Sequence, residues 1–143
     1  MKATATALFA LLVLASAAWP ADTPAGWTPD LFQNASTIEF FTTNAAGDQH
    51  WSRVWVVVID GAPYVRLGSA STERVNGNVN SPYVNIRVGG QEFDHVKLQS
   101  APEMKDKIMA AMADKYTTDI LARLMPHELF MRLVPAPPTA ATH

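Results

Sequence analysis

The stretch that decides the fold runs from Trp51 to Gly61 and reads WSRVWVVVIDG. Tryptophan and arginine alternate with serine and valine in its first half, which is the period-two pattern of a β-strand. From Val56 to Ile59 every side chain is apolar, which is typical of a central strand covered on both faces. Asp60-Gly61 is a frequent hairpin-turn pair, so we expect the chain to return as a strand over Tyr64–Leu67.

Outward from this hairpin, the same patterns predict four more strands and two helices. The further strands are expected over Thr37–Thr42, Tyr83–Val88, Gln91–Gln99 and Glu128–Val134. Ser100 and Glu103 form a capping box, which predicts a helix from Ser100 to about Tyr116. A second helix is expected from Thr118 to Pro126, just before the last strand.

Two shorter segments complete this prediction. Thr28-Pro29-Asp30 has a capping hydroxyl, a proline and an acid in order, which predicts a helix of one or two turns. Gly68–Pro82 is polar and rich in turn residues, so we expect a long loop of the kind that carries function. The fold class is therefore α+β, a six-stranded antiparallel sheet with two helices inserted before the last strand, and closure into a barrel would remove its edges.

The N-terminus has the pattern of a secretory signal peptide over residues 1–21. Lys2 is followed by the apolar run Ala7–Leu14 and by small residues that offer a cleavage site at Ala15-Ser16-Ala17. The run is shorter than the roughly 20 residues that span a bilayer, although an uncleaved anchor is the alternative. We expect an exported protein, periplasmic or secreted, with no stable membrane anchor after cleavage. Its parts would be a proline-rich arm (22–36), the barrel domain (37–135) and a disordered tail (136–143).

Composition excludes several kinds of site and partner. None of the 143 residues is a cysteine, so disulfides, thiol chemistry and cysteine-ligated zinc are excluded. The formal net charge of -2 gives no electrostatic case for binding nucleic acid. The four histidines are scattered without metal-ligand spacing, so no metal site is expected. His50, beside Trp51, is the histidine to consider as a haem ligand.

Several short segments, taken in order, resemble one known superfamily. They read TIEFFTT (37–43), VWVVVIDG (54–61), YVRLGS (64–69), NSPYVNIRVGG (80–90), KY (115–116) and RLVP (132–135). Together they resemble the FMN-binding split-barrel superfamily, which includes the pyridoxamine-phosphate oxidases and the deazaflavin-dependent nitroreductases. The likeness spans Ile38 to Pro135 and is greatest to an uncharacterised branch near the nitroreductases. The resemblance implies a split β-barrel, FMN or a deazaflavin coenzyme as cofactor, and a homodimer with the cofactor at its interface.

In that superfamily the third strand and the following loop help to hold the cofactor phosphate. By position, the resemblance implies a phosphate-binding set of Arg66, Ser69, Ser71, Thr72 and Arg74. An arginine with neighbouring hydroxyls supplies the charge and the neutral donors that a phosphate needs. Relatives often carry an aromatic pair just after this loop, whereas this chain has Glu73 beside Arg74. Arg66 and Arg74 on solvated surfaces, the latter paired with Glu73, are the alternative interpretation.

A second candidate site lies on the strand expected over residues 51–59. Trp51, Arg53 and Trp55 share one strand face, which suggests a cation–π stack at the edge of a pocket where a planar ring could bind. Arg53 and Trp55 are therefore candidate cofactor-binding residues, and Arg87 has a similar setting on Tyr83–Arg87. The alternative is that these arginines only cover aromatic surface and extend to water.

No acid–base pair or nucleophile is identified in the sequence, so the catalytic residues are unknown. A flavin enzyme does not need one, because the cofactor carries the redox chemistry. The leading hypothesis is an exported split barrel that binds a flavin-like or deazaflavin cofactor. The sequence is compatible with an oxidoreductase and equally compatible with a protein that is not an enzyme. The alternatives are a non-catalytic exported binding module that has lost the cofactor, and a haem binder.

Overall fold

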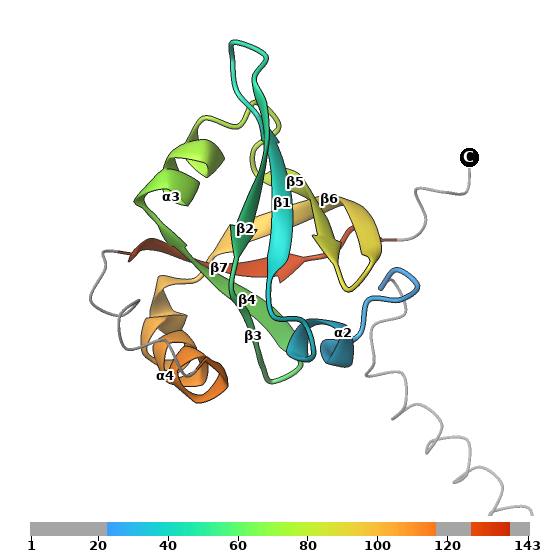
Figure 1. Cartoon of the computed structure of the whole chain (residues 1–143), viewed down its shortest axis with the longest axis vertical. Helices are drawn as coiled ribbons and strands as arrows, with labels where there is room; N and C mark the ends of the chain where they lie inside the picture. Colours follow the sequence, from blue (N-terminus) through green and yellow to red (C-terminus); the bar gives the residue numbers. More distant parts are fainter. Residues whose placement is uncertain (1–22, 117–126, 138–143) are drawn as a thin grey trace, which may run out of the picture.

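Trp55 divides the long strand expected over residues 51–59 into two strands, β2 (Gln49–Val54) and β3 (Val56–Ile59). The computed structural model describes residues 23–116 and 127–137 (Figure 1). Within these ranges the other strands are β1 (Ile38–Thr43), β4 (Ala62–Gly68), β5 (Tyr83–Val88), β6 (Gln91–Ser100) and β7 (His127–Val134). The helices there are α2 (Pro29–Gln33), α3 (Ser69–Asn76), the 3-10 turn η1 (Pro102–Met104) and α4 (Lys105–Lys115).

The strands form one curled antiparallel sheet (Figure 1). Its strand order among the described residues is β2-β1-β5-β6-β7-β4-β3, and each neighbouring pair is antiparallel. The first and last strands of this order, β2 and β3, are separated in the chain only by Trp55. An antiparallel barrel of the α+β class is therefore confirmed, with seven strands rather than six because of the bend at Trp55.

The apolar half of that strand is covered on both faces, as predicted, but it is not central in the strand order. Val56 packs in the barrel core, which also contains Phe40 and Ile86. Val57, on the opposite face, belongs to a second cluster with Ile108 and Met112 of α4. Burial on both faces therefore reflects a barrel core on one side and a helix on the other (Figure 1).

The loop predicted over Gly68–Pro82 is wrong in its first half, because Ser69–Asn76 forms α3. The serines, threonine and asparagine of this segment are typical of loops. However, Thr72 and Val75 are both buried, which places one face of the helix against the protein. This packing outweighs the weak local preference.

The capping box predicted at Ser100 is also wrong. Ser100 is the last residue of β6 and lies opposite Met131 of β7. The amide of Ala101 then donates to the carbonyl of Phe130 at 2.8 Å, so sheet pairing continues past the expected cap. The 3-10 turn follows, and α4 begins at Lys105.

The short N-terminal helix is confirmed. The Thr28 hydroxyl caps α2 by accepting from the Leu31 amide at 3.3 Å. Phe32 of this helix is fully buried, and its ring lies 4.7 Å from that of Trp27. No helix in the described part of the chain is long and apolar enough to cross a membrane. The expected signal peptide (1–21), second helix (118–126) and residues 138–143 of the expected tail lie outside the described residues.

Candidate functional site

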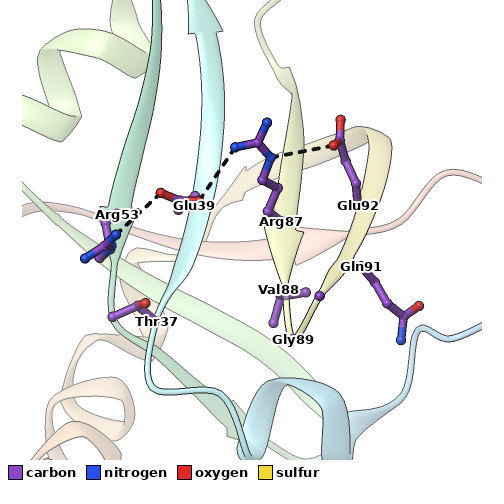
Figure 2. A pocket seen from close by; sticks show the side chains of 9 residues that line it. Thr37, Glu39, Arg53, Arg87, Val88, Gly89, Gln91 and Glu92 are labelled. Carbon is purple, nitrogen blue, oxygen red and sulfur yellow. Dashed lines mark ion pairs between the residues drawn. The ribbon is translucent and has the colours of Figure 1, made fainter.

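The outer face of β2, β1, β5 and β6 carries a row of charged side chains. Strand register places Arg53 opposite Glu39, Glu39 opposite Arg87, and Arg87 opposite Glu92. Figure 2 shows the three ion pairs along this row. Their N–O distances are 3.8 Å (Arg53–Glu39), 4.0 Å (Arg87–Glu39) and 3.6 Å (Arg87–Glu92). The side chain of Arg53 is 71% exposed and that of Arg87 is 49% exposed. Such long, exposed pairs are weak, so a bound anion can compete for either guanidinium.

An aromatic row lies beside the charged row. Trp51 pairs with Phe41 across the β1–β2 ladder, and their ring centroids are 5.0 Å apart. The guanidinium carbon of Arg87 lies 3.6 Å from the centroid of the Trp51 ring. The sequence predicts a cation–π contact on this face with Arg53, but the structure places Arg87 over the indole instead. The reason is register, because Arg53 meets Glu39 while Arg87 reaches Trp51 from β5.

A pocket of about 400 Å³ opens at the charged row (Figure 2). Its lining residues are Thr37, Glu39, Arg53, Arg87, Val88, Gly89, Gly90, Gln91 and Glu92. Gly89 and Gly90 form the β5–β6 turn with φ angles of +56° and +82°, which glycine adopts without strain. The pocket therefore combines two guanidinium groups with a tight turn, and Arg87 links it to the aromatic row through its contact with Trp51.

A second hollow of about 310 Å³ lies on the other side of Phe41. It is lined by Phe41, Asn80, Tyr83, Val84, Asn85 and His95. The rings of Tyr83 and His95 are stacked, with centroids 3.8 Å apart and planes inclined by 10°. His95 has φ of +58° at the irregular point of the β5–β6 ladder, and its amide donates to the Asn85 side-chain oxygen at 3.3 Å. Flat rings therefore gather along this face on both sides of Phe41.

Arg66, which the sequence places in the expected phosphate-binding set, is buried beneath α4. It is only 5% exposed, and its Nη1 donates to the Met109 sulfur at 3.1 Å. Its guanidinium lies 5.6 Å from the ring centroid of Trp55, and Trp55 stacks on Tyr116 with planes inclined by 3°. The structure thus brings two predicted residues together, Arg66 and Trp55, and places both at the packing contact of α4.

The end of α4 is held at the strand bend by polar contacts. The Tyr116 hydroxyl accepts from the Val56 amide at 3.1 Å and lies 2.8 Å from the Ser36 carbonyl oxygen, to which it can donate. Lys115 donates to the carbonyl oxygens of Val56 at 2.8 Å and Phe32 at 3.1 Å. Burial raises the pKa of the Tyr116 phenol, against smaller opposing effects of the Val56 hydrogen bond and the Arg66 charge. Burial likewise lowers the pKa of Lys115.

The remaining predicted residues lie on α3 and face different ways. Thr72 is buried, and its hydroxyl donates to the Leu67 carbonyl at 3.4 Å. Ser69 is exposed and Ser71 is half-buried. Arg74 lines a separate pocket of about 240 Å³ between α3 and the β1–β2 turn. The structure therefore places the seven predicted residues in three regions rather than at one site.

Sequence reasoning did not commit to Trp51, Arg87 or His95, although all three lie on the outer face. Trp51 and Arg87 carry a local signal, because buried residues alternate with exposed ones beside them, whereas His95 follows the exposed Asp94 at the irregular point of the β5–β6 ladder. What was missing was the register that brings Arg87 to Trp51. His50, the predicted haem candidate, is exposed and lies opposite Thr42. In residues 23–116 and 127–137, no group of three or more acidic, histidine or cysteine side chains could hold a metal ion.

Comparisons with known proteins identify the fold. No protein-family model matches the chain, and no curated protein matches it. Several solved structures are similar at low sequence identity. An F420-H2-dependent reductase is 13% identical with a TM-score of 0.53, covering 69% of this chain and 93% of its own. The haem storage protein HutZ from Vibrio cholerae is 18% identical with a TM-score of 0.52, covering 76% and 85%.

A third similar structure is described as a domain-swapped dimer, 12% identical with a TM-score of 0.53, covering 69% of this chain and 79% of its own. At these identities the likeness is one of fold. It agrees with the curled antiparallel sheet of this chain. The chain therefore has the split-barrel fold, as its sequence resemblance to the FMN-binding split-barrel superfamily implies.

Proposed function

We propose that this chain is an exported split-barrel protein that binds a planar, anionic cofactor of the flavin or deazaflavin class on its outer face. The observation that carries the proposal is that Arg87 both lines the 400 Å³ pocket and lies over the ring of Trp51. An indole with a guanidinium over it is a surface on which a flat ring can stack. A pocket of this volume lies within the range typical of small-molecule sites, about 300–1,000 Å³.

The residues present fit such a group chemically. Trp51 and Phe41 offer aromatic surface for the ring system. Arg53 and Arg87 supply charge-assisted donors for a phosphate, and a phosphate carries more charge than the carboxylate of Glu39 that it would displace. When bound, the cofactor supplies hydride transfer, and the protein residues bind it and orient it. The similar F420-H2-dependent reductase supports a cofactor of this type.

The same face is proposed to be the contact between two copies of the chain. Trp51, Phe41 and Tyr83 are only half-buried there, and a similar structure is described as a domain-swapped dimer. Large aromatic residues are enriched at the centres of protein interfaces. A sedimentation measurement that finds only monomer at every concentration would remove this part of the proposal.

The cofactor proposal is tested by titrating the purified protein with FMN and with a deazaflavin coenzyme, following tryptophan fluorescence. We expect one of the two to bind with micromolar affinity, and Trp51→Ala and Arg87→Gln to weaken that binding at least about tenfold. Arg132→Gln is the matched control, because Arg132 is exposed on β7 and lines another pocket. If neither cofactor binds, the chain is a binding module without this cofactor and the proposal is wrong.

Haem is a second candidate, favoured by one specific observation. His95 stacks on Tyr83 in the 310 Å³ hollow, so an imidazole and a flat aromatic wall lie together there. Histidine is a common axial ligand of haem iron, and HutZ, a haem storage protein, shares the fold. On adding haem, an absorption shift that His95→Ala abolishes and His50→Ala leaves intact would select this candidate over a flavin.

A further inference from the structure

The pocket between α3 and the β1–β2 turn lies apart from the outer face. Its volume is about 240 Å³, and its lining residues are Thr42, Asn44, Asp48, Ala70, Glu73, Arg74 and Gly77. It shares no lining residue with either hollow on the outer face. The proposed cofactor site therefore leaves this pocket without a role.

Charges of both signs line this pocket, and none of the ion pairs within 4.0 Å in the described part of the chain joins them. Arg74 makes no ion pair within 4.0 Å and no hydrogen bond through its side chain in the described part of the chain, although Glu73 and Asp48 line the same pocket. Glu73 and Arg74 are consecutive on a helix, and consecutive helical residues do not face each other. The guanidinium of Arg74 and the carboxylates of Glu73 and Asp48 can therefore contact different groups of a ligand in the pocket.

One carboxylate is held in place by the turn. The Asn44 side-chain amide donates to Oδ2 of Asp48 at 3.2 Å, while its oxygen accepts from the Asp48 amide at 2.9 Å and the Ala46 amide at 3.0 Å. These bonds orient the Asp48 side chain and leave its Oδ1 for another donor. The turn is therefore built around a fixed acceptor at the rim of the pocket.

The barrel side of the pocket is polar and buried. Thr42 is 4% exposed and contributes to the lining. Ser52 is its diagonal neighbour on the inner face of β2, is 6% exposed, and has a hydroxyl with no hydrogen-bond partner among the described atoms. Buried hydroxyls are normally hydrogen-bonded, so the Ser52 hydroxyl indicates an ordered water behind Thr42, on the barrel side of the pocket.

From this arrangement we propose that the pocket binds a free α-amino acid, with its carboxylate on Arg74 and its ammonium on Asp48 and Glu73. A guanidinium pairs with a carboxylate through two parallel hydrogen bonds, and carboxylates accept from an ammonium. Two acids and one arginine give the pocket a formal charge of -1. A basic amino acid such as L-lysine, which carries a net positive charge, therefore binds more tightly than L-alanine, and L-glutamate binds most weakly.

Isothermal titration of the purified protein with L-lysine tests this proposal. We expect millimolar or tighter binding, and a loss of at least about tenfold for cadaverine, which lacks the carboxylate, and for Nα-acetyl-L-lysine, which lacks the α-ammonium. Equal binding of either analogue, or the order L-glutamate above L-lysine, overturns the proposal. Absence of L-lysine binding to a protein that circular dichroism shows to be folded also overturns it.

Matched variants locate the site. Arg74→Gln and Glu73→Gln each weaken L-lysine binding at least about tenfold, because each removes a charge that contacts the ligand. Both residues are exposed, so the variants are expected to keep the fold. Arg132→Gln and Trp51→Ala leave the affinity for L-lysine unchanged. Loss of L-lysine binding in Trp51→Ala, with no loss in Arg74→Gln, would move the ligand to the outer face and contradict the assignment. Trp51→Ala is expected to weaken cofactor binding and to leave L-lysine binding unchanged. The cofactor proposal and the amino-acid proposal can therefore fail independently of each other.

Discussion

Arg66 and Arg87 have similar settings in the sequence and opposite settings in the structure. Each alternates with apolar residues on a strand, yet Arg66 is 5% exposed while the side chain of Arg87 is 49% exposed. The difference arises from α4, which packs against β3 and β4 and leaves the outer face of β1 and β5 uncovered by it (Figure 1). The same strand pattern therefore leads to packing beneath the helix and to an open, charged face beside it.

The largest expected effect is on the covered side. Trp55→Ala removes the stack with Tyr116 and its contact with Arg66, so we expect the free energy of unfolding to fall by about 3 kcal/mol. Trp51→Ala, on the open face, should cost less than about 1.5 kcal/mol because its ring contacts only Phe41 and Arg87 among the rings and cations described. Urea unfolding of both variants measures the contrast, and equal losses would mean that the two faces do not differ in this way.

On the open face the large effect is expected on binding. Arg87→Gln should weaken cofactor binding by about tenfold, which corresponds to about 1.4 kcal/mol, with little change in stability. Its ion pairs are long and exposed, so the protein loses little when they are removed. Fluorescence titration together with urea unfolding checks both statements, and a stability loss as large as that of Trp55→Ala would make Arg87 a structural residue.

The pH dependence of stability sharpens the account of the covered side. The pKa of Lys115 is lower in the folded chain than its ordinary value of 10.5, so the unfolded chain binds more protons just below pH 10.5. In that range Lys115 therefore makes the free energy of unfolding rise with pH. The folded pKa of Tyr116 is raised above its ordinary value of 10.0, so the folded chain binds more protons above pH 10.0 and its contribution makes stability fall. In Tyr116→Phe the contribution of Tyr116 is removed, and only the rise caused by Lys115 remains. Urea unfolding across this range should show the fall in the wild-type protein alone.

The smallest effect is expected at the centre of the charged row. Glu39→Gln removes two ion pairs of 3.8 and 4.0 Å, and we expect the free energy of unfolding to change by no more than about 1 kcal/mol. Because Glu39 competes with an anionic ligand for Arg53 and Arg87, the same variant should bind the cofactor a few-fold more tightly. Weaker binding in this variant would show that Glu39 positions the arginines rather than competing for them.

The strands and the fold class could be predicted because period-two alternation is a local signal. Residues 83–88 were assigned correctly, and the resemblance to split barrels is supported by structures of the same fold. The helix over Ser69–Asn76 could not be predicted, because it depends on Thr72 and Val75 packing against the barrel. The candidate site was only partly predictable for the same reason. Its central contact joins Trp51 and Arg87, which are distant in the chain and meet only through strand register.

The most direct test of the central claim compares Arg87→Gln with Arg74→Gln in parallel titrations of FMN and the deazaflavin coenzyme. Arg74 belongs to the phosphate set expected from the sequence, whereas Arg87 belongs to the outer face that the structure defines. We predict at least about tenfold weaker binding in Arg87→Gln and unchanged binding in Arg74→Gln. Loss of binding in Arg74→Gln with full affinity in Arg87→Gln would contradict the account and return the cofactor to α3.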